Sequence, residues 1–272
     1  MSADGETLDR SQPVTKYRQL FVDRIAQELA RAPKPLTALD FACGDGFATL
    51  GLHANLPPGS RIVAIGGARD ALKRFHDTVS EALRPSLFIR KESQARLPFD
   101  NNAFDVAWAS LDTQRLSDPR ALLRQVMRTV RAPGQVLIAT PLRETVLELM
   151  RSLTPLCASE SVRSLFDDDP TLFSSDEWVA ELEKMDAVDV GVATHAVAVR
   201  LERPISDHSI FVQHLLPLLT HGAGEGREHL IEMLDAGLDA PVELTVPIAC
   251  VHGRKVRPPR GDAPADPKNA TA

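Results

Sequence analysis

The sequence is poor in cysteine and aromatic residues, and it has no long apolar run. Its 272 residues include three cysteines, one tyrosine and two tryptophans. Cys43, Cys157 and Cys250 are widely spaced and form no pair motif, which favours reduced thiols in a cytoplasmic protein. No apolar stretch approaches the roughly 20 residues that a membrane-spanning helix needs. The polar, acidic start of the chain is unlike a signal peptide.

A strong positive charge is also missing. The formal net charge of −6 argues against a nucleic-acid-binding surface over the whole molecule. With 43% hydrophobic and 25% charged residues, the composition is typical of a globular protein with one large domain or two small ones. Three consecutive carboxylates, Asp167 to Asp169, have no further spaced ligands near them. They favour a solvated loop over a metal site.

Apolar runs alternate with helical patterns over the first half of the chain. Five runs suit strands, of which 61–65 suits a sheet buried on both faces, and helical spacing lies before, between and after them. The predicted strands are 36–41, 61–65, 86–90, 104–109 and 135–140, and the predicted helices are 14–32, 47–54, 70–83 with Asp70 as its cap, and 119–130. This alternation predicts a parallel sheet with right-handed crossovers.

The second half of the chain is less regular. It predicts helices at 144–153, after a cap at Ser174 or Ser175, at 206–219 and at 225–236, with strands at 188–201 and 241–251. We expect residues 1–13 to be mobile. The chain is thus divided into an N-terminal helical extension (1–32), a single domain (33–257) and a disordered tail (258–272).

The most informative motif is the turn that follows the first predicted strand. The apolar run ends at a small-residue turn, Ala42 to Gly46, and a helical segment begins at Phe47. Glycine permits positive φ and a close approach to a ligand, and the first N–H groups of the next helix attract anions. Only Gly44 and Gly46 are present, so the turn is not the dinucleotide fingerprint, which makes an NAD(P)-dependent enzyme a poor fit.

The stretch Leu39 to Gly46 resembles the first motif of class I S-adenosylmethionine (SAM) dependent methyltransferases. Residues 96–106 and 126–141 resemble the segments around the family's fourth and fifth strands, and 236–243 resembles the end of a bacterial, type 11-like branch. The resemblance implies an α/β, Rossmann-like fold with a seven-stranded, mostly parallel sheet whose last strand is antiparallel. It also implies SAM as cofactor and S-adenosylhomocysteine as product.

The same resemblance implies where SAM would be held. In the family, the turn lies against the amino-acid end of SAM, the end of the second strand approaches the ribose, and the leading helix often covers the cofactor. For Tyr17 in that helix, packing against the sheet is the favoured interpretation. The implied contacts are Tyr17, Asp40, Ala42, Cys43, Gly44, Gly46, Gly66, Gly67, Glu92, Ser93 and Ser110.

The sequence departs from the family where acids usually hold SAM. Active members end the second strand with Asp or Glu, which binds both ribose hydroxyls, but Gly66 stands there and Gly67 follows. Losing such bonds weakens binding by roughly tenfold to several hundredfold. The adenine-binding acid is replaced by Ser93, with Glu92 beside it. Two smaller departures, Ala42 and Gln135 at positions where glycine is common, are interpreted as minor or neutral.

No residue is assigned to catalysis. Methyl transfer from a sulfonium depends mainly on alignment of the methyl group and the nucleophile. Asp112 follows the fourth strand and is a candidate general base, although a loop cap or solvated acid is its commoner role. The histidines, including His53, His195 and His208, form no recognisable arrangement.

Two functions therefore stay open from the sequence. The first is a SAM-dependent methyltransferase acting on a small-molecule acceptor, which the intact turn favours. The second is a degenerate methyltransferase fold that serves as a binding or regulatory module, which the two missing acids favour. The partner is accordingly a small molecule or a protein, and neither nucleic acid nor membrane is expected.

Overall fold

The computed structural model describes residues 7–11, 13–29, 34–92, 96–111, 118–153, 155, 172–219 and 224–256, with the side chains of 224–227 left out. The sequence predictions on Ser93, Asp112, Cys157 and the carboxylates 167–169 lie outside the described residues, as does the tail 258–272.

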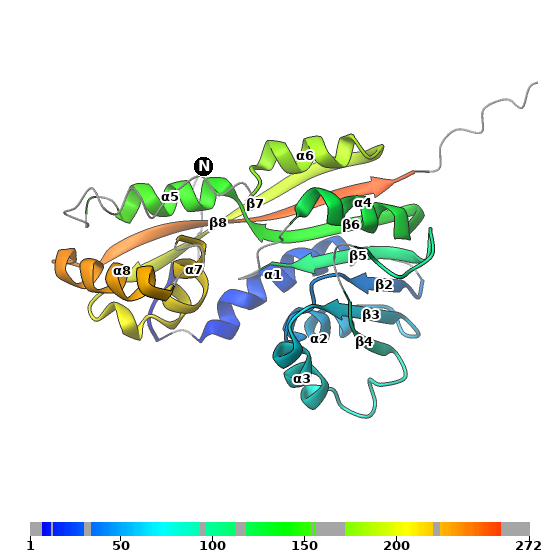
Figure 1. The fold of residues 1–272 in the computed structure, drawn as a ribbon, viewed down its shortest axis with the longest axis horizontal. Helices are drawn as coiled ribbons and strands as arrows, with labels where there is room; N and C mark the ends of the chain where they lie inside the picture. Colours follow the sequence, from blue (N-terminus) through cyan, green and yellow to red (C-terminus); the bar gives the residue numbers. More distant parts are fainter. Residues whose placement is uncertain are drawn as a thin grey trace, which may run out of the picture.

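One sheet of eight strands runs through the described part of the chain (Figure 1), in the order β1-β7-β8-β6-β5-β2-β3-β4. The strands are β1 (Thr7–Leu8), β2 (Thr37–Asp40), β3 (Arg61–Gly66), β4 (Leu87–Lys91), β5 (Phe104–Ser110), β6 (Val130–Pro141), β7 (Ala187–Leu201) and β8 (Val242–Lys255). Strands β2 to β6 pair in parallel, and β8 is antiparallel to both β6 and β7. The predicted α/β fold with an antiparallel last strand is confirmed.

The eighth strand corrects two predictions. Seven strands were expected, and residues 1–13 were expected to be mobile, but Thr7 and Leu8 pair in parallel with Ala198 and Val199 of β7. Leu8 is fully buried there. A two-residue strand is too short to show an apolar period in the sequence. Its pairing is visible only in the folded sheet, where it lies beside β7.

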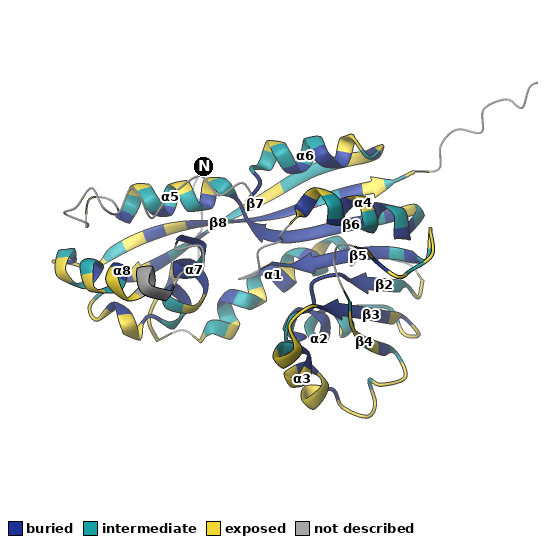
Figure 2. Ribbon diagram, viewed as in Figure 1, coloured by how far each residue is buried: buried dark blue, intermediate teal, exposed yellow. Residues whose placement is uncertain are grey.

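Helices cover both faces of the sheet. They are α1 (Val14–Leu29), α2 (Phe47–His53), α3 (Arg69–Thr78), α4 (Pro119–Thr129), α5 (Arg143–Leu153), α6 (Ser175–Glu183), α7 (Leu216–Leu219) and α8 (Gly224–Gly237), with a 3-10 turn at Ile205–Asp207 and a π-helix at Phe211–Leu215. Apolar side chains of α1, α2 and α3 join one core, and those of α4 and α6 join a second core on the other face. Figure 2 shows the central strands buried between these layers, with α3 exposed on its outer side.

Helix α3 differs from the prediction at both ends. Ala68, not Asp70, occupies the N-cap, and Asp70 lies in the first turn. The helix ends at Thr78, because Val79 has an extended backbone with ψ of 119°, whereas the pattern predicted an end near Leu83. By contrast, the predicted cap of α6 is confirmed: the Ser174 hydroxyl accepts from the Glu177 amide, and the Glu177 carboxylate accepts from the Ser174 amide.

Candidate cofactor site

The turn after β2 is fixed to both neighbouring strands. The Phe41 amide donates to the Trp108 carbonyl of β5, and the Cys43 amide donates to the Ile65 carbonyl of β3, each at 3.0 Å. Gly44 and Gly46 have φ values of 53° and 84°, in the left-handed region that favours glycine. The turn therefore lies at the carboxyl ends of three parallel strands, where ligands of open α/β sheets bind.

Two amides of this turn donate to no residue that the structure describes. Among the described residues, no hydrogen bond is made by the N–H groups of Gly44 and Asp45, although the Gly46 amide donates to the Cys43 carbonyl at 2.8 Å. Gly44 and Asp45 are partly exposed, whereas their neighbours Cys43 and Gly46 are buried. Adjacent unpaired amides at the start of a helix suit a carbonyl or carboxylate oxygen of a ligand.

Asp40 lies beneath the turn and supports it. Its carboxylate accepts hydrogen bonds from the Thr49 hydroxyl at 2.7 Å and from the Ala42 amide at 3.2 Å. The side chain is fully buried. Burial raises the pKa of Asp40 to about 6, and these two hydrogen bonds oppose the rise. Asp40 thus connects β2 to α2 and fixes the backbone of the turn at Ala42.

Arg18 of α1 binds the middle of the turn, a contact that the sequence analysis missed. Its guanidinium donates to both carboxylate oxygens of Asp45, at 2.9 and 2.6 Å, and lies 4.4 Å from the centre of the Phe47 ring. Burial favours the neutral acid, but the bonds and charge of Arg18 outweigh it and hold the pKa of Asp45 below its usual value. Helix α1 is thereby anchored over the turn.

Phe75 of α3 packs directly against Gly46, which the sequence analysis also missed. A Cβ atom at Gly46 would lie 2.0 Å from Cδ2 of the Phe75 ring. Phe75 is fully buried. Glycine is therefore required at this position by packing and by positive φ together, whether or not a cofactor binds.

The two glycines at the end of β3 have different surroundings. A Cβ atom at Gly66, the position of the missing ribose acid, would lie 3.0 Å from Cδ2 of Leu72 and 3.3 Å from Sγ of Cys43. Gly67 has no atom within 4 Å of the same point, and neither glycine lies in the left-handed region. An acidic side chain at Gly66 would therefore meet Leu72 and Cys43, whereas a side chain at position 67 would have free space.

The other predicted cofactor contacts, Glu92, Ser110 and Tyr17, lie in different surroundings. Glu92 forms an ion pair with Arg90 at 2.9 Å, and its amide donates to the Gly66 carbonyl, so Glu92 lies beside the end of β3. Ser110 ends β5 and is 9% exposed. Tyr17 is fully buried, with its ring centre 5.3 Å from that of Phe21, so it lies in the core beneath α1.

Two thiols and two histidines serve packing or local hydrogen bonds. Burial raises the pKa of the Cys43 thiol, and burial also raises the pKa of Cys250 to about 12. The ring of His53 bonds the Ser86 hydroxyl at 2.8 Å, and that of His208 bonds the backbone of Glu202. The described residues contain no group of three His, Cys, Asp or Glu side chains that could hold a metal ion.

Comparisons with known proteins agree with this arrangement. A family model described as a methyltransferase domain matches residues 38–134, which run from the second residue of β2 into β6 and include the turn. Residues 38–134 are thus similar to a methyltransferase domain. Of the described helices, none combines the length and apolar character needed to cross a bilayer.

Two curated relatives match part of this chain. A malonyl-[acyl-carrier protein] O-methyltransferase from Hahella chejuensis is 28% identical over 124 residues, which is 44% of this chain and 42% of that protein. A demethylmenaquinone methyltransferase from Lactococcus lactis is 22% identical over 101 residues, 37% of this chain and 40% of that protein. The chain thus matches about two fifths of the length of either relative.

Solved structures share the fold over most of the chain. The YcgJ protein from Bacillus subtilis has a TM-score of 0.62 at 14% identity and covers 88% of this chain and 100% of its own. The [4+2]-cyclase SpnF has a TM-score of 0.56 at 16% identity over 88% of this chain and 81% of its own. At these identities the likeness establishes the fold alone.

Proposed function

We propose that the chain is a SAM-dependent methyltransferase acting on a small-molecule acceptor. The observation that carries this proposal is the pair of amides at Gly44 and Asp45, which donate to no described residue and lie in a turn at the carboxyl edge of the sheet. Arg18 and Asp45 place a cation and an anion beside these amides. A ligand end that has both an ammonium and a carboxylate, as in SAM and S-adenosylhomocysteine, suits this set of groups.

Each part of the site has a separate task under this proposal. The turn amides bind the amino-acid end, Asp40 holds those amides in place, and Arg18 keeps α1 over the turn. SAM itself supplies the electrophilic methyl group, so the chain mainly needs to align donor and acceptor. The net charge of −6 favours a small acceptor over a nucleic acid.

A second candidate, a binding module without methyl transfer, is favoured by the ribose position. Leu72 and Cys43 crowd the place where an acidic side chain would begin at Gly66. Gly46 is explained by Phe75 alone, so its retention does not require a cofactor. A cyclase with this fold also illustrates that the fold does not dictate methyl transfer.

Calorimetry with SAM and S-adenosylhomocysteine distinguishes the two candidates. The methyltransferase predicts a Kd of roughly 1–100 μM for the purified chain, whereas absence of binding at about 1 mM supports the binding module. Gly44→Arg should abolish binding by blocking the turn. Gly59→Arg is the matched control, because Gly59 also has a positive φ, 86°, but precedes β3 at the opposite edge. Equal loss in both variants would indicate misfolding, which thermal unfolding of each would reveal.

A further inference from the structure

The end of β3 carries positive charge at the place where an acidic residue would hold a ribose. In doubly wound α/β folds, the residue that meets the ribose of a nucleotide lies about 20 residues after the glycine turn, at the end of the next strand. Gly66 occupies this place. Residues 66–92 contain six Lys or Arg and four Asp or Glu, although the whole chain has 31 and 37. This part of the chain is therefore cationic within an acidic protein.

Strand register places a lysine beside Gly66. Lys91 of β4 is the direct partner of Gly66 in the parallel pair of β3 and β4. Directly opposed residues point to the same face of a sheet, and a Cβ atom at Gly66 would lie 3.0 Å from Leu72 of α3. Lys91 is exposed, and β4 is the outermost strand of the sheet. The side chain of Lys91 thus begins on the α3 side of the sheet, next to the end of β3.

Helix α3 adds two arginines on the same side. Arg69 is the first residue of this helix, three positions after Gly66, and it is exposed beside one acid, Asp70. Arg74 is also exposed on α3, whose outer side is visible in Figure 2. Burial raises the pKa of Asp45 in the glycine turn, whereas the bidentate ion pair described above and the charge of Arg74 lower it. Arg74 therefore lies within electrostatic reach of the turn.

The two acids nearest to the turn and to β4 are already paired with other arginines. Asp45 forms its ion pair with Arg18 at 2.6 Å, and Glu92 forms one with Arg90 at 2.9 Å. Residues 93–95, which follow in the chain, are Ser, Gln and Ala and add no charge. Among the described residues, positive charge is therefore in excess beside the end of β3.

Open space lies beside these cations, at Gly67. No atom lies within 4 Å of the point that a Cβ atom of Gly67 would occupy. SAM carries a net positive charge, because its sulfonium and ammonium groups outweigh one carboxylate, so excess positive charge does not favour it. In doubly wound folds, an arginine near the end of this strand accommodates a phosphate on the ribose, in place of the acid that binds free hydroxyls.

We propose that the end of β3 binds the ribose of a nucleotide that carries a phosphate at its 2′ or 3′ position. Lys91 and Arg69 pair with this phosphate, and Arg74 adds attraction at longer range. The proposal rests on the position of the ribose in the proposed cofactor site, but it concerns a ligand other than SAM and needs no methyl transfer. Such a nucleotide competes with S-adenosylhomocysteine for the site.

Calorimetry with three adenosine phosphates on the full chain tests the proposal. Adenosine 2′,5′-bisphosphate or adenosine 3′,5′-bisphosphate should bind at least about tenfold more tightly than adenosine 5′-monophosphate, which lacks the ribose phosphate. The tighter of the two bisphosphates identifies the phosphorylated hydroxyl. S-adenosylhomocysteine, where it binds, should be displaced by that bisphosphate.

Two substitutions test the residues that carry the proposal. Arg69→Gln and Lys91→Gln should each weaken the bisphosphate by about tenfold and change binding of the monophosphate by less than about twofold. Lys184→Gln is the matched control, since it removes the same charge from α6, which packs on β7 near the other end of the sheet, and it should leave both affinities unchanged. All three side chains are exposed, and thermal unfolding checks that each variant folds.

The outcomes separate this proposal from the methyltransferase. A bisphosphate that binds no more tightly than the monophosphate would overturn the proposal, as would a preference that survives both Arg69→Gln and Lys91→Gln. Tight binding of the bisphosphate without binding of S-adenosylhomocysteine would support the proposal and refute the methyltransferase. Binding of S-adenosylhomocysteine with no preference for a bisphosphate would overturn this proposal alone.

Discussion

Arg18 and Asp45 are 27 residues apart in the sequence, yet they form a bidentate ion pair that joins α1 to the glycine turn. The side chains of Arg18 and Asp45 are 20% and 33% exposed, so water only partly screens the pair. This relationship makes the leading helix part of the candidate cofactor site, although α1 carries no motif of its own.

Replacement of Arg18 by glutamine should lower the free energy of unfolding by about 1–2 kcal/mol at pH 7, since the ion pair and the contact with Phe47 are lost. Urea denaturation measures the change. The folded-state pKa of Asp45 is lowered, so the stabilisation is present above its ordinary value of 3.8 and disappears as the pH falls through the folded-state value. The effect of Arg18→Gln should therefore fade in strong acid.

The exposed pair Lys73–Asp77 is the matched control for this measurement. Its two side chains are 77% and 65% exposed, so Lys73→Gln should change stability by less than about 0.5 kcal/mol. An equally small change for Arg18→Gln would contradict the anchoring of α1 through Asp45.

Asp40→Asn should remove a pH dependence of stability. The pKa of Asp40 is raised from 3.8 to about 6 because the carboxylate is buried, so folding favours its protonated form. The contribution of Asp40 to the free energy of unfolding is fully present below pH 3.8 and is lost as the pH rises through 6, a change of roughly 3 kcal/mol. The variant does not lose this free energy, so between pH 4 and pH 8 its stability should rise by about this amount relative to the unmodified chain. Parallel stability curves for the two proteins would contradict the buried acid.

Gly46→Ala should cost roughly 2–5 kcal/mol, because the methyl group meets the Phe75 ring and the backbone is left-handed. In a Phe75→Ala background the clash disappears, and the cost of the same substitution should fall to about 1–2 kcal/mol. Gly67→Ala, where the space is open, is the neutral control. A cost for Gly46→Ala that is independent of Phe75 would assign the requirement for glycine to the backbone alone.

Restoring the ribose acid should depend on Leu72. Gly66→Asp forces Leu72 and Cys43 to move, so alone it should tighten SAM binding little and cost about 1–3 kcal/mol of stability. With Leu72→Ala in the same chain, the acid has room, and affinity for S-adenosylhomocysteine should rise about 10- to 100-fold over Leu72→Ala alone. Calorimetry measures both. Gly67→Asp adds the same charge one residue later, and an equal gain there would show that only charge near the site matters.

The sequence by itself determined the local features of this protein. Alternating apolar runs predicted the parallel strands, because such a sheet is buried on both faces. Ser174 or Ser175 was predicted to cap a helix, and Ser174 does so. Glycine at positions 44 and 46 predicted backbone with positive φ, which both residues have. These features depend on interactions within a few residues, so their patterns are visible in the chain, and the methyltransferase resemblance followed from them.

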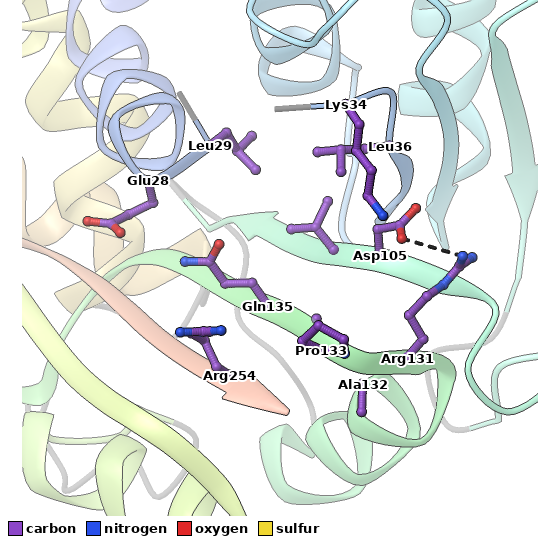
Figure 3. Close-up of a pocket in the computed structure, with 12 residues that line it drawn as sticks. Glu28, Leu29, Lys34, Leu36, Asp105, Arg131, Ala132, Pro133, Gln135 and Arg254 are labelled. Carbon is purple, nitrogen blue, oxygen red and sulfur yellow. Dashed lines mark ion pairs between the residues drawn. The ribbon is translucent and has the colours of Figure 1, made fainter. Parts of the chain in front are cut away.

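Only the tertiary structure decided what surrounds those features. Three contacts join segments that are distant in the sequence: the packing of the Phe75 ring against Gly46, the ion pair of Arg18 with Asp45, and the pairing of β1 with β7. A cavity of about 470 Å³ near the start of β6 is likewise lined by Glu28, Gln135 and Arg254, which come from distant segments (Figure 3). Such contacts arise from the way strands align across the sheet and helices pack on it, and no periodicity in the chain records which distant side chains will meet.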